Sequence, residues 1–184
     1  VLIMGGGSGV GSFGIQIAKL YNCDVIATAS PDKLDKCLEL GADFAVDHRK
    51  EDWHKEVRAI SKELAKKKGE APGIDLSFDH IGETHWNQQL QLLKYGATLV
   101  SCGATTGYNA KTDLRHVFFK GTNILGSTQG TKAELDQALY WMGQGKIKAA
   151  IDSTYTFEQA AEAHTKMLTG KGLFGKILMK PEGA

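Results

Sequence analysis

The feature that most constrains this chain is a glycine-rich run, GGGSGVG at residues 5–11, between two segments of different periodicity. The segment VLIM at residues 1–4 is typical of a buried strand, and residues 9–21 have apolar positions at helical spacing. Glycines let a backbone pass close to another group, and the N–H groups at a helix N-terminus attract anions. The run therefore predicts a strand–turn–helix unit with an anion site at its turn.

Short apolar runs alternate with helical patterns over the first two thirds of the chain. Several runs are continuous, as expected for strands that are covered on both faces of a parallel sheet. The alternation implies right-handed crossovers, so we expect an α/β fold with a Rossmann-type, doubly wound parallel sheet. The predicted strands are residues 1–5, 24–29, 43–47, 74–80, 97–102 and 122–126, and the predicted helices are 9–21, 31–40, 51–66 and 84–93.

The first predicted helix is amphipathic, and its apolar face is expected to meet the sheet. Gly14 lies on that face and is expected to let the helix pack tightly. The residues of the face are Val10, Phe13, Gly14, Ile17 and Tyr21.

The pattern changes after residue 128, which predicts a dinucleotide-binding domain over 1–128 and a separate C-terminal segment over 129–184. The chain also starts directly in an apolar strand, with no initiator Met and no leader, which suggests a domain cut from a longer polypeptide. The segment after the boundary contains a predicted helix at 131–144, a β-like stretch at 151–157, a helix at 158–169 and a strand at 175–179.

The composition limits the partners of this chain. Its 22 Lys and Arg against 21 Asp and Glu leave a net charge of +1, so no global field favours nucleic acid or an anionic membrane. No apolar run approaches the about 20 residues that a membrane span needs. Cys23, Cys37 and Cys102 form no CxxC pair and are odd in number, which favours a reducing compartment over a disulfide framework. We therefore expect a cytoplasmic protein with small-molecule partners.

The glycine run favours a dinucleotide over other anions. Gly6, Gly9 and Gly11 follow a strand and open a helix, although Ser8 replaces the middle glycine of the strict G-x-G-x-x-G pattern. No Gly-Lys-Ser/Thr follows, so the run is not a P-loop. A generic tight turn would also use glycines, but the strand–helix context favours the seat of a pyrophosphate.

The end of the second predicted strand favours NADP(H) over NAD(H). An acid about 20 residues after the loop would bind a ribose 2′-hydroxyl, whereas this strand ends in Ala27–Ser30 without one. Ser30, Lys33 and the pair His48-Arg49 would suit a 2′-phosphate instead. The alternative is that Lys33 and Arg49 are ordinary solvated charges at helix ends.

Other strand ends predict the nicotinamide side, because the ligand of an open α/β sheet lies across the carboxyl edge of its strands. His80 and Cys102 lie at two of these ends, but nothing orients the histidine as a base, and a small buried hydrophobe is the simpler role for the cysteine. Catalytic residues therefore remain unknown, and no metal ligands are assigned. The cofactor contacts predicted on this side are His80, Cys102, Gly103, Ala104 and Leu125.

Several motifs together resemble the medium-chain dehydrogenase/reductase family, in its quinone oxidoreductase-like and zinc-type alcohol dehydrogenase branches. The resemblance covers the whole chain. Its motifs are GGSGVG at 6–11, IQIAK at 15–19, VIATA at 25–29, LGAD at 40–43, FDHIG at 78–82, GATLVSCG at 96–103 and FGKI at 174–177.

This resemblance implies hydride transfer with NADP(H) or NAD(H) bound between this domain and a GroES-like catalytic domain. In that family most of the catalytic domain precedes the glycine loop, and the C-terminal tail returns to complete it. Zinc ligands, where present, and most substrate contacts would then lie outside this chain, which alone would be inactive. Lys33, His48 and Lys171 match positions that hold a 2′-phosphate. The full predicted cofactor set is Gly6, Ser8, Gly9, Val10, Gly11, Ser30, Lys33, His48, His80, Cys102, Gly103, Ala104, Leu125 and Lys171.

Other interpretations remain. The loop also resembles the opening of short-chain dehydrogenases, but no tyrosine here has a lysine four residues later, so that class is set aside. The chain or its parent could instead bind nucleotide without catalysis, as a sensor or interaction module. The sheet edge at 122–126 could pair across a two-fold axis and give a homodimer.

Overall fold

The computed structural model describes residues 1–181 and contains one six-stranded sheet and one two-stranded sheet. All neighbouring strands of the large sheet are parallel, and its order reverses direction at β1, which confirms the predicted doubly wound fold. From edge to edge the strands are β3 (Phe44–Asp47), β2 (Ile26–Ala29), β1 (Leu2–Ile3), β4 (Ile74–Asp79), β5 (Leu93–Ser101) and β6 (Asn123–Gly126).

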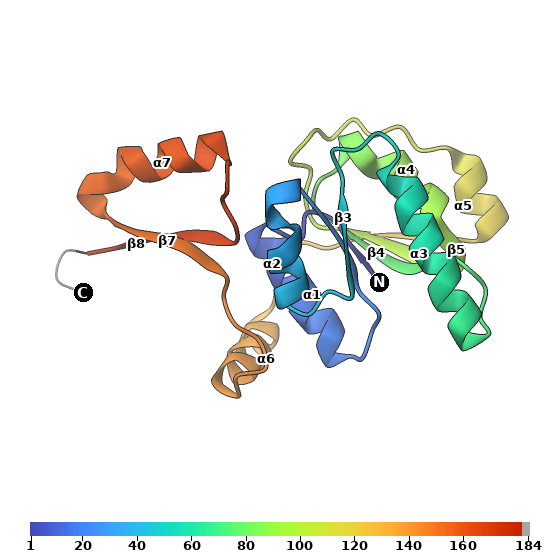
Figure 1. Ribbon diagram of the computed structural model, residues 1–184, viewed down its shortest axis with the longest axis horizontal. Helices are drawn as coiled ribbons and strands as arrows, with labels where there is room; N and C mark the ends of the chain where they lie inside the picture. The colour runs from blue at the N-terminus through green and yellow to red at the C-terminus, as the bar shows by residue number, and fades with distance from the viewer. Residues whose placement is uncertain (182–184) are drawn as a thin grey trace.

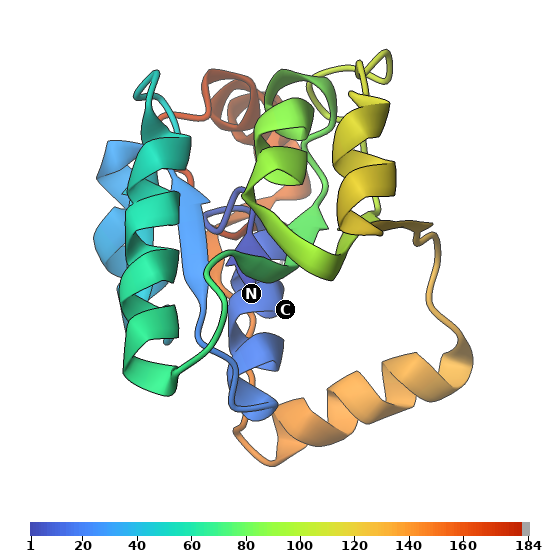
Figure 2. The ribbon, with the colours of Figure 1, turned by 90° about the vertical axis from the view of Figure 1, so that its right-hand side faces the viewer.

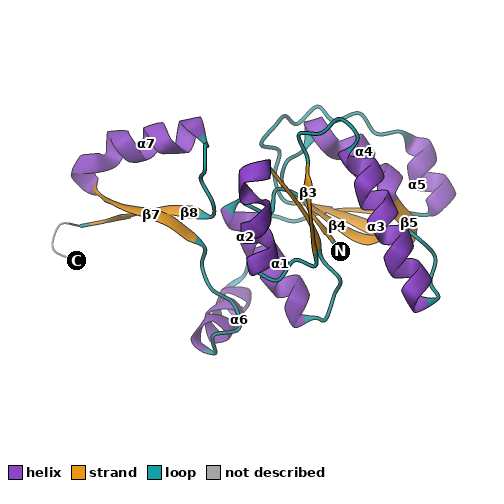
Figure 3. Ribbon diagram, viewed as in Figure 1, coloured by secondary structure: helices purple, strands orange, loops and turns teal. Residues whose placement is uncertain are grey.

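Helices cover the two faces of this sheet (Figures 1 and 3). The helices α1 (Gly9–Leu20) and α2 (Leu34–Glu39) pack on one face, around Ile3 and Ala27. On the other face, α3 (Trp53–Lys68) and α4 (Trp86–Leu92) pack around Leu2 and Leu99, and α5 (Leu114–Lys120) packs beside α4. Successive residues of a strand point to opposite faces, so Leu2 and Ile3 belong to different core clusters.

Two elements differ from the sequence-based expectation. Helix α5 was not predicted, because its Phe118 and Phe119 are about two thirds exposed and leave no buried stripe to detect. The helix predicted over 84–93 begins with a 3₁₀ turn, Glu83–His85, and ends at Leu92, so β5 starts four residues earlier than predicted. Short helices carry little periodicity, which makes their boundaries hard to place.

The buried face of α1 was also predicted wrongly. This helix buries Ser12, Ile15 and Gln16, whereas Val10 is 40% exposed and Tyr21 is 67% exposed. Gln16 is buried because its side-chain amide makes two hydrogen bonds with the backbone of Lys148 in the C-terminal segment. A polar residue therefore lies at the centre of the packed face, and hydrophobicity alone could not indicate it.

The C-terminal segment forms its own small layer beside the large sheet (Figure 1). Its strands β7 (Ile151–Thr156) and β8 (Lys176–Lys180) pair in parallel, with α7 (Ala160–Thr169) between them in sequence. Helix α6 (Lys132–Gly143) has no buried residue and lies apart from the sheet (Figure 2). The boundary predicted at residue 128 stays a prediction, and residues 182–184 of that segment lie outside the described residues.

No helix within residues 1–181 is both long enough and apolar enough to cross a membrane. The cysteines at 23, 37 and 102 are all free thiols, in agreement with the absence of a predicted disulfide framework.

A buried polar network fixes the carboxyl end of β4. The Asp79 carboxylate is fully buried and accepts hydrogen bonds from the backbone N–H groups of Ile81 and Gly82. The Gln89 side chain, also fully buried, donates to Asp79 at 2.9 Å and accepts from the Ser77 hydroxyl at 2.7 Å. Buried polar groups must find partners, so this network sets the path of the chain after β4.

We predict that Gln89→Leu lowers the free energy of unfolding by about 1–3 kcal/mol, because it leaves the buried Ser77 hydroxyl and the Asp79 carboxylate each short of one partner. Urea denaturation measures this loss. Gln88→Leu is the matched control, since Gln88 lies on the same helix and takes no part in the network. Equal losses in both variants would contradict the role given to Gln89.

Candidate functional site

The glycine run forms the turn from β1 to α1 and is held by a very close backbone approach. A Cβ atom at Gly11 would lie 2.3 Å from the carbonyl oxygen of Gly5, so only glycine fits there. The turn is fixed to β2 by the Gly6 N–H, which donates to the Thr28 carbonyl at 2.7 Å. Gly14 is different, because a Cβ there would meet its neighbours at an ordinary 3.4 Å. The tight packing predicted at Gly14 therefore does not require glycine.

Ser8 leaves the start of α1 open to an anion. Its hydroxyl oxygen caps the helix by accepting from the Gly11 N–H at 2.9 Å. The first-turn N–H groups of Gly9 and Val10 have no acceptor within the helix. Together with the helix dipole they form a seat for a negatively charged group. Ser8 also hydrogen-bonds the His80 ring at Nε2, 3.2 Å away, which joins the turn to the end of β4.

A cavity of about 330 Å³ opens beside this turn, and we refer to it as the loop cavity. The residues predicted to hold the 2′-phosphate follow β2 and β3 and reach this cavity, since parallel strands end at one edge of the sheet. They are Ser30, Lys33, His48 and Arg49. Gly6, Val10 and Gly11 belong to the turn without lining the cavity. The predicted cofactor residues that do line it are Ser8, Gly9, Ser30, Lys33 and His48. The lining residues are Gly5, Gly7, Ser8, Gly9, Ala29, Ser30, Lys33, His48, Arg49, Leu173 and Gly175.

The loop cavity has cationic walls and no acidic one among the described residues. Lys33 and Arg49 supply the positive charge. Burial, and then the neighbouring His85 ring, lower the pKa of His48 below its usual value, so this imidazole is neutral at pH 7. A doubly charged phosphate would therefore find two cations and a neutral hydrogen-bonding ring in a lining that contains no acidic residue.

Lys33 runs along the glycine turn instead of pointing into solvent. A Cβ at Gly7 would lie 2.7 Å from the Lys33 Cδ atom, so the side chain crosses Gly7 closely. Its ammonium reaches the carbonyl oxygen of Gly170, 3.4 Å away, at the end of α7. Lys33 thus links the turn, the loop cavity and the C-terminal segment.

The residues predicted for the nicotinamide side lie together at the ends of β4, β5 and β6. A Cβ at Gly103 would lie 3.0 Å from the His80 carbonyl oxygen, and the Cys102 N–H donates to the Asp79 carbonyl. Ala104 packs against Gly82, and Leu125 is 52% exposed on β6. These residues form a continuation of the edge that begins at Ser8 and His80.

The thiols near the site are not activated. Burial, and then the nearby Asp79 carboxylate, raise the pKa of Cys102, so it stays protonated at pH 7. Burial raises the pKa of Cys37 to about 12, and this side chain packs beneath Gly6. Neither geometry nor charge makes a nucleophile here, and Cys102 is only partly buried.

Three residues of the C-terminal segment reach the site without any signal in the local sequence. Leu173 and Gly175 line the loop cavity, and the Gly175 N–H donates to the Gly7 carbonyl at 2.9 Å. The side chain of Lys176 lies over Gly9, where a Cβ would come within 2.0 Å of its Cε atom. The predicted Lys171 is exposed between Gly170 and Gly172 and does not line the cavity. Nothing in the motif FGKI at residues 174–177 indicates the return to residues 7–9.

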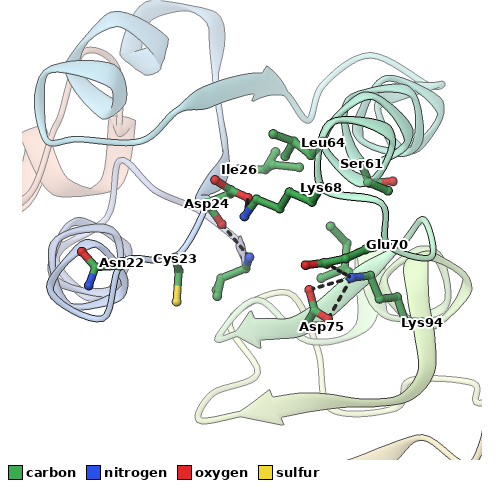
Figure 4. A pocket seen from close by; sticks show the side chains of 14 residues that line it. Asn22, Cys23, Asp24, Ile26, Ser61, Leu64, Lys68, Glu70, Asp75 and Lys94 are labelled. Atoms are coloured by element: carbon green, nitrogen blue, oxygen red, sulfur yellow. Dashed lines mark hydrogen bonds and ion pairs between the residues drawn. The ribbon is translucent and has the colours of Figure 1, made fainter.

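A second cavity of similar volume, about 330 Å³, lies at the opposite, amino edge of the sheet (Figure 4). Its lysines are paired with carboxylates: Lys68 with Asp24, and Lys94 with Asp75 and Glu70. Ligands of open α/β sheets bind at the carboxyl edge, so this paired cluster is not the candidate site.

Comparison with known proteins identifies the family. The model of the zinc-binding dehydrogenase family matches residues 9–144. The quinone oxidoreductase of Pongo abelii is 32% identical over 186 residues, which cover 97% of this chain and 54% of that protein. The chain therefore spans about half the length of this relative.

Solved structures agree. A NAD-dependent alcohol dehydrogenase is 35% identical with a TM-score of 0.86, covering 97% of this chain and 50% of that one. A variant of crotonyl-CoA carboxylase/reductase AntE in complex with NADP is 25% identical with a TM-score of 0.83. The match covers 97% of this chain and 48% of that one. The resemblance to medium-chain dehydrogenases/reductases is thus confirmed, and the chain belongs to the zinc-binding dehydrogenase family.

Proposed function

We propose that this chain binds NADP(H) in preference to NAD(H), and that the whole protein transfers a hydride between this cofactor and a carbonyl, enone, quinone or alcohol. The observation that carries the proposal is the loop cavity, which joins the first residue of α1, Gly9, to Lys33 and Arg49 and has no acidic residue in its lining among residues 1–181. The structures similar to this chain include an NAD-dependent protein and one in complex with NADP. The proposed preference therefore rests on the positive charge of Lys33 and Arg49.

Each part of the edge has a role in this proposal. The N–H groups of Gly9 and Val10 would hold the pyrophosphate, with the Lys176 side chain beside them. Ser30, Lys33, His48 and Arg49 would hold the adenosine ribose and its 2′-phosphate. The bound nicotinamide would supply or accept the hydride. The ends of β4 and β5 would orient its ring beside His80, with Cys102, Gly103, Ala104 and Leu125 along the edge.

The substrate would bind largely outside this chain. The named relatives act on a quinone, an alcohol or a crotonyl-CoA, and this chain spans about half of each. Strands β7 and β8 present exposed Ile151 and Leu178, an apolar surface that would suit contact with a catalytic domain of the whole protein. Within residues 1–181 no three His, Cys, Asp or Glu side chains lie together as metal ligands would, so these residues do not fit a zinc site. That the isolated chain lacks turnover stays a prediction.

We predict that wild-type chain binds NADPH more tightly than NADH, and that Lys33→Ala weakens NADPH binding about tenfold by removing a charged hydrogen bond to the 2′-phosphate. NADH affinity should change less than about twofold. Nucleotide fluorescence titration measures both.

Lys67→Ala, a charge removal on the exposed end of α3, is the matched control for Lys33→Ala. Equal affinities for the two dinucleotides, unchanged by Lys33→Ala, would reject the 2′-phosphate assignment.

A second prediction compares two glycines of one helix. Gly11→Ala should weaken binding of both dinucleotides by about tenfold or more, because the new Cβ would overlap the Gly5 carbonyl and force the turn open. Gly14→Ala should leave affinity unchanged and stabilise the helix by about 1 kcal/mol. Titration and urea denaturation test both variants, and a similar loss of binding in the two would show that the turn is not the pyrophosphate seat.

We also propose that β6 pairs with its copy in a homodimer. All four residues of this edge strand are exposed, among them Ile124 and Leu125. An unpaired edge of this kind is a template for another strand.

Light scattering should therefore give about twice the 19.9 kDa mass of the chain, and Ile124→Lys should shift it toward the monomer. Leu178→Lys on β8, a substitution of similar exposure, is the control. A monomeric wild type, or equal dissociation by both variants, would exclude pairing through β6.

A further inference from the structure

A strap formed by residues 170–176 crosses the glycine turn and closes one side of the loop cavity. Its Gly175 is bonded to Gly7, and Phe174 is only 7% exposed and packs in the α1–α2 core cluster. Leu173 and Gly175 form its contribution to the cavity wall. The strap is therefore part of the site, although it lies about 160 residues after the turn in sequence.

Two consecutive residues hold the other end of this strap. The ammonium of Lys33 contacts the Gly170 carbonyl, and the carboxylate of Asp32 accepts a hydrogen bond from the Gly172 N–H at 3.1 Å. The Ser30 hydroxyl, and also the Gly172 N–H, lower the pKa of Asp32, so its carboxylate is charged at pH 7. Asp32 thus lies between two residues that line the loop cavity, Ser30 and Lys33, and is not itself part of the lining.

The position of this carboxylate matters for the choice of dinucleotide. An acid facing the adenosine ribose would accept hydrogen bonds from the two hydroxyls of NAD(H) and repel the 2′-phosphate of NADP(H). Asp32 is close enough in sequence to take that position. In this structure its carboxylate is bonded to the strap instead.

We propose that the hydrogen bond between Asp32 and Gly172 determines cofactor specificity: the strap holds the carboxylate away from the loop cavity and so keeps the cavity selective for a 2′-phosphorylated dinucleotide. Asp32 is a positioning residue and not a catalytic one: the effect of its carboxylate on dinucleotide preference depends on the place in which the strap holds it. This inference rests on the proposed NADP(H) preference and assigns it a cause beyond the cations that line the cavity.

The test removes the donor. Gly172→Pro deletes the N–H group, and it also replaces a residue with a left-handed φ of +70°. A Cβ at this position would meet no atom within 4 Å, so the new side chain overlaps nothing, and the enforced change of φ acts on the strap itself. The ratio of NADPH to NADH affinity should fall about fivefold or more, because the released carboxylate would approach the 2′-phosphate. In an Asp32→Asn background the same change should alter the ratio less than about twofold, since no charge is released.

Two further variants complete the experiment. Gly172→Ala keeps the N–H but disfavours the left-handed backbone, and it should give the same effect in weaker form if the proline variant folds poorly. Gly145→Pro, at an exposed left-handed glycine in the α6–β7 loop, is the matched control.

The outcomes separate the two proposals. A selective wild type whose ratio does not respond to Gly172→Pro, or responds equally in the Asp32→Asn background, overturns the role of the strap alone. A wild-type ratio near one that Lys33→Ala leaves unchanged overturns the NADP(H) preference and this inference together.

Discussion

The fold and the site both depend on the approach of the Gly11 backbone to the carbonyl oxygen of Gly5. No side chain fits in that contact, and without it α1 could not begin directly where β1 ends. The tight turn places the helix N-terminus at the carboxyl edge of the sheet, with Ser8 as its cap. The anion seat is thus a consequence of the way in which the first strand connects to the first helix.

The same edge is shaped by a buried charge further along the sheet. Asp79 is fully buried and is satisfied by backbone N–H groups and by Gln89, which fixes the path of the chain through His80 to Gly82. Because His80 bonds to Ser8, the end of β4 and the glycine turn form one connected structure. The predicted nicotinamide side and the predicted pyrophosphate seat are therefore held together by hydrogen bonds within the protein itself.

The C-terminal segment lies beside the large sheet and contributes to the loop cavity. Residues 170–176 cross the turn, and the pair Asp32 and Lys33 holds them. A segment that belongs to a second sheet thereby contributes to a cavity of the first. The strap thus connects the loop cavity to the small sheet of β7 and β8.

The sequence by itself determined the doubly wound sheet, the glycine turn and the cations at the ends of β2 and β3, because apolar periodicity and glycine spacing are local signals. The tertiary structure decided the rest. Helix α5 carries exposed phenylalanines and so has no stripe to detect, and Gln16 is buried only because Lys148 returns to it. The strap reaches Gly7 through contacts between residues far apart in sequence, and no local pattern encodes such contacts.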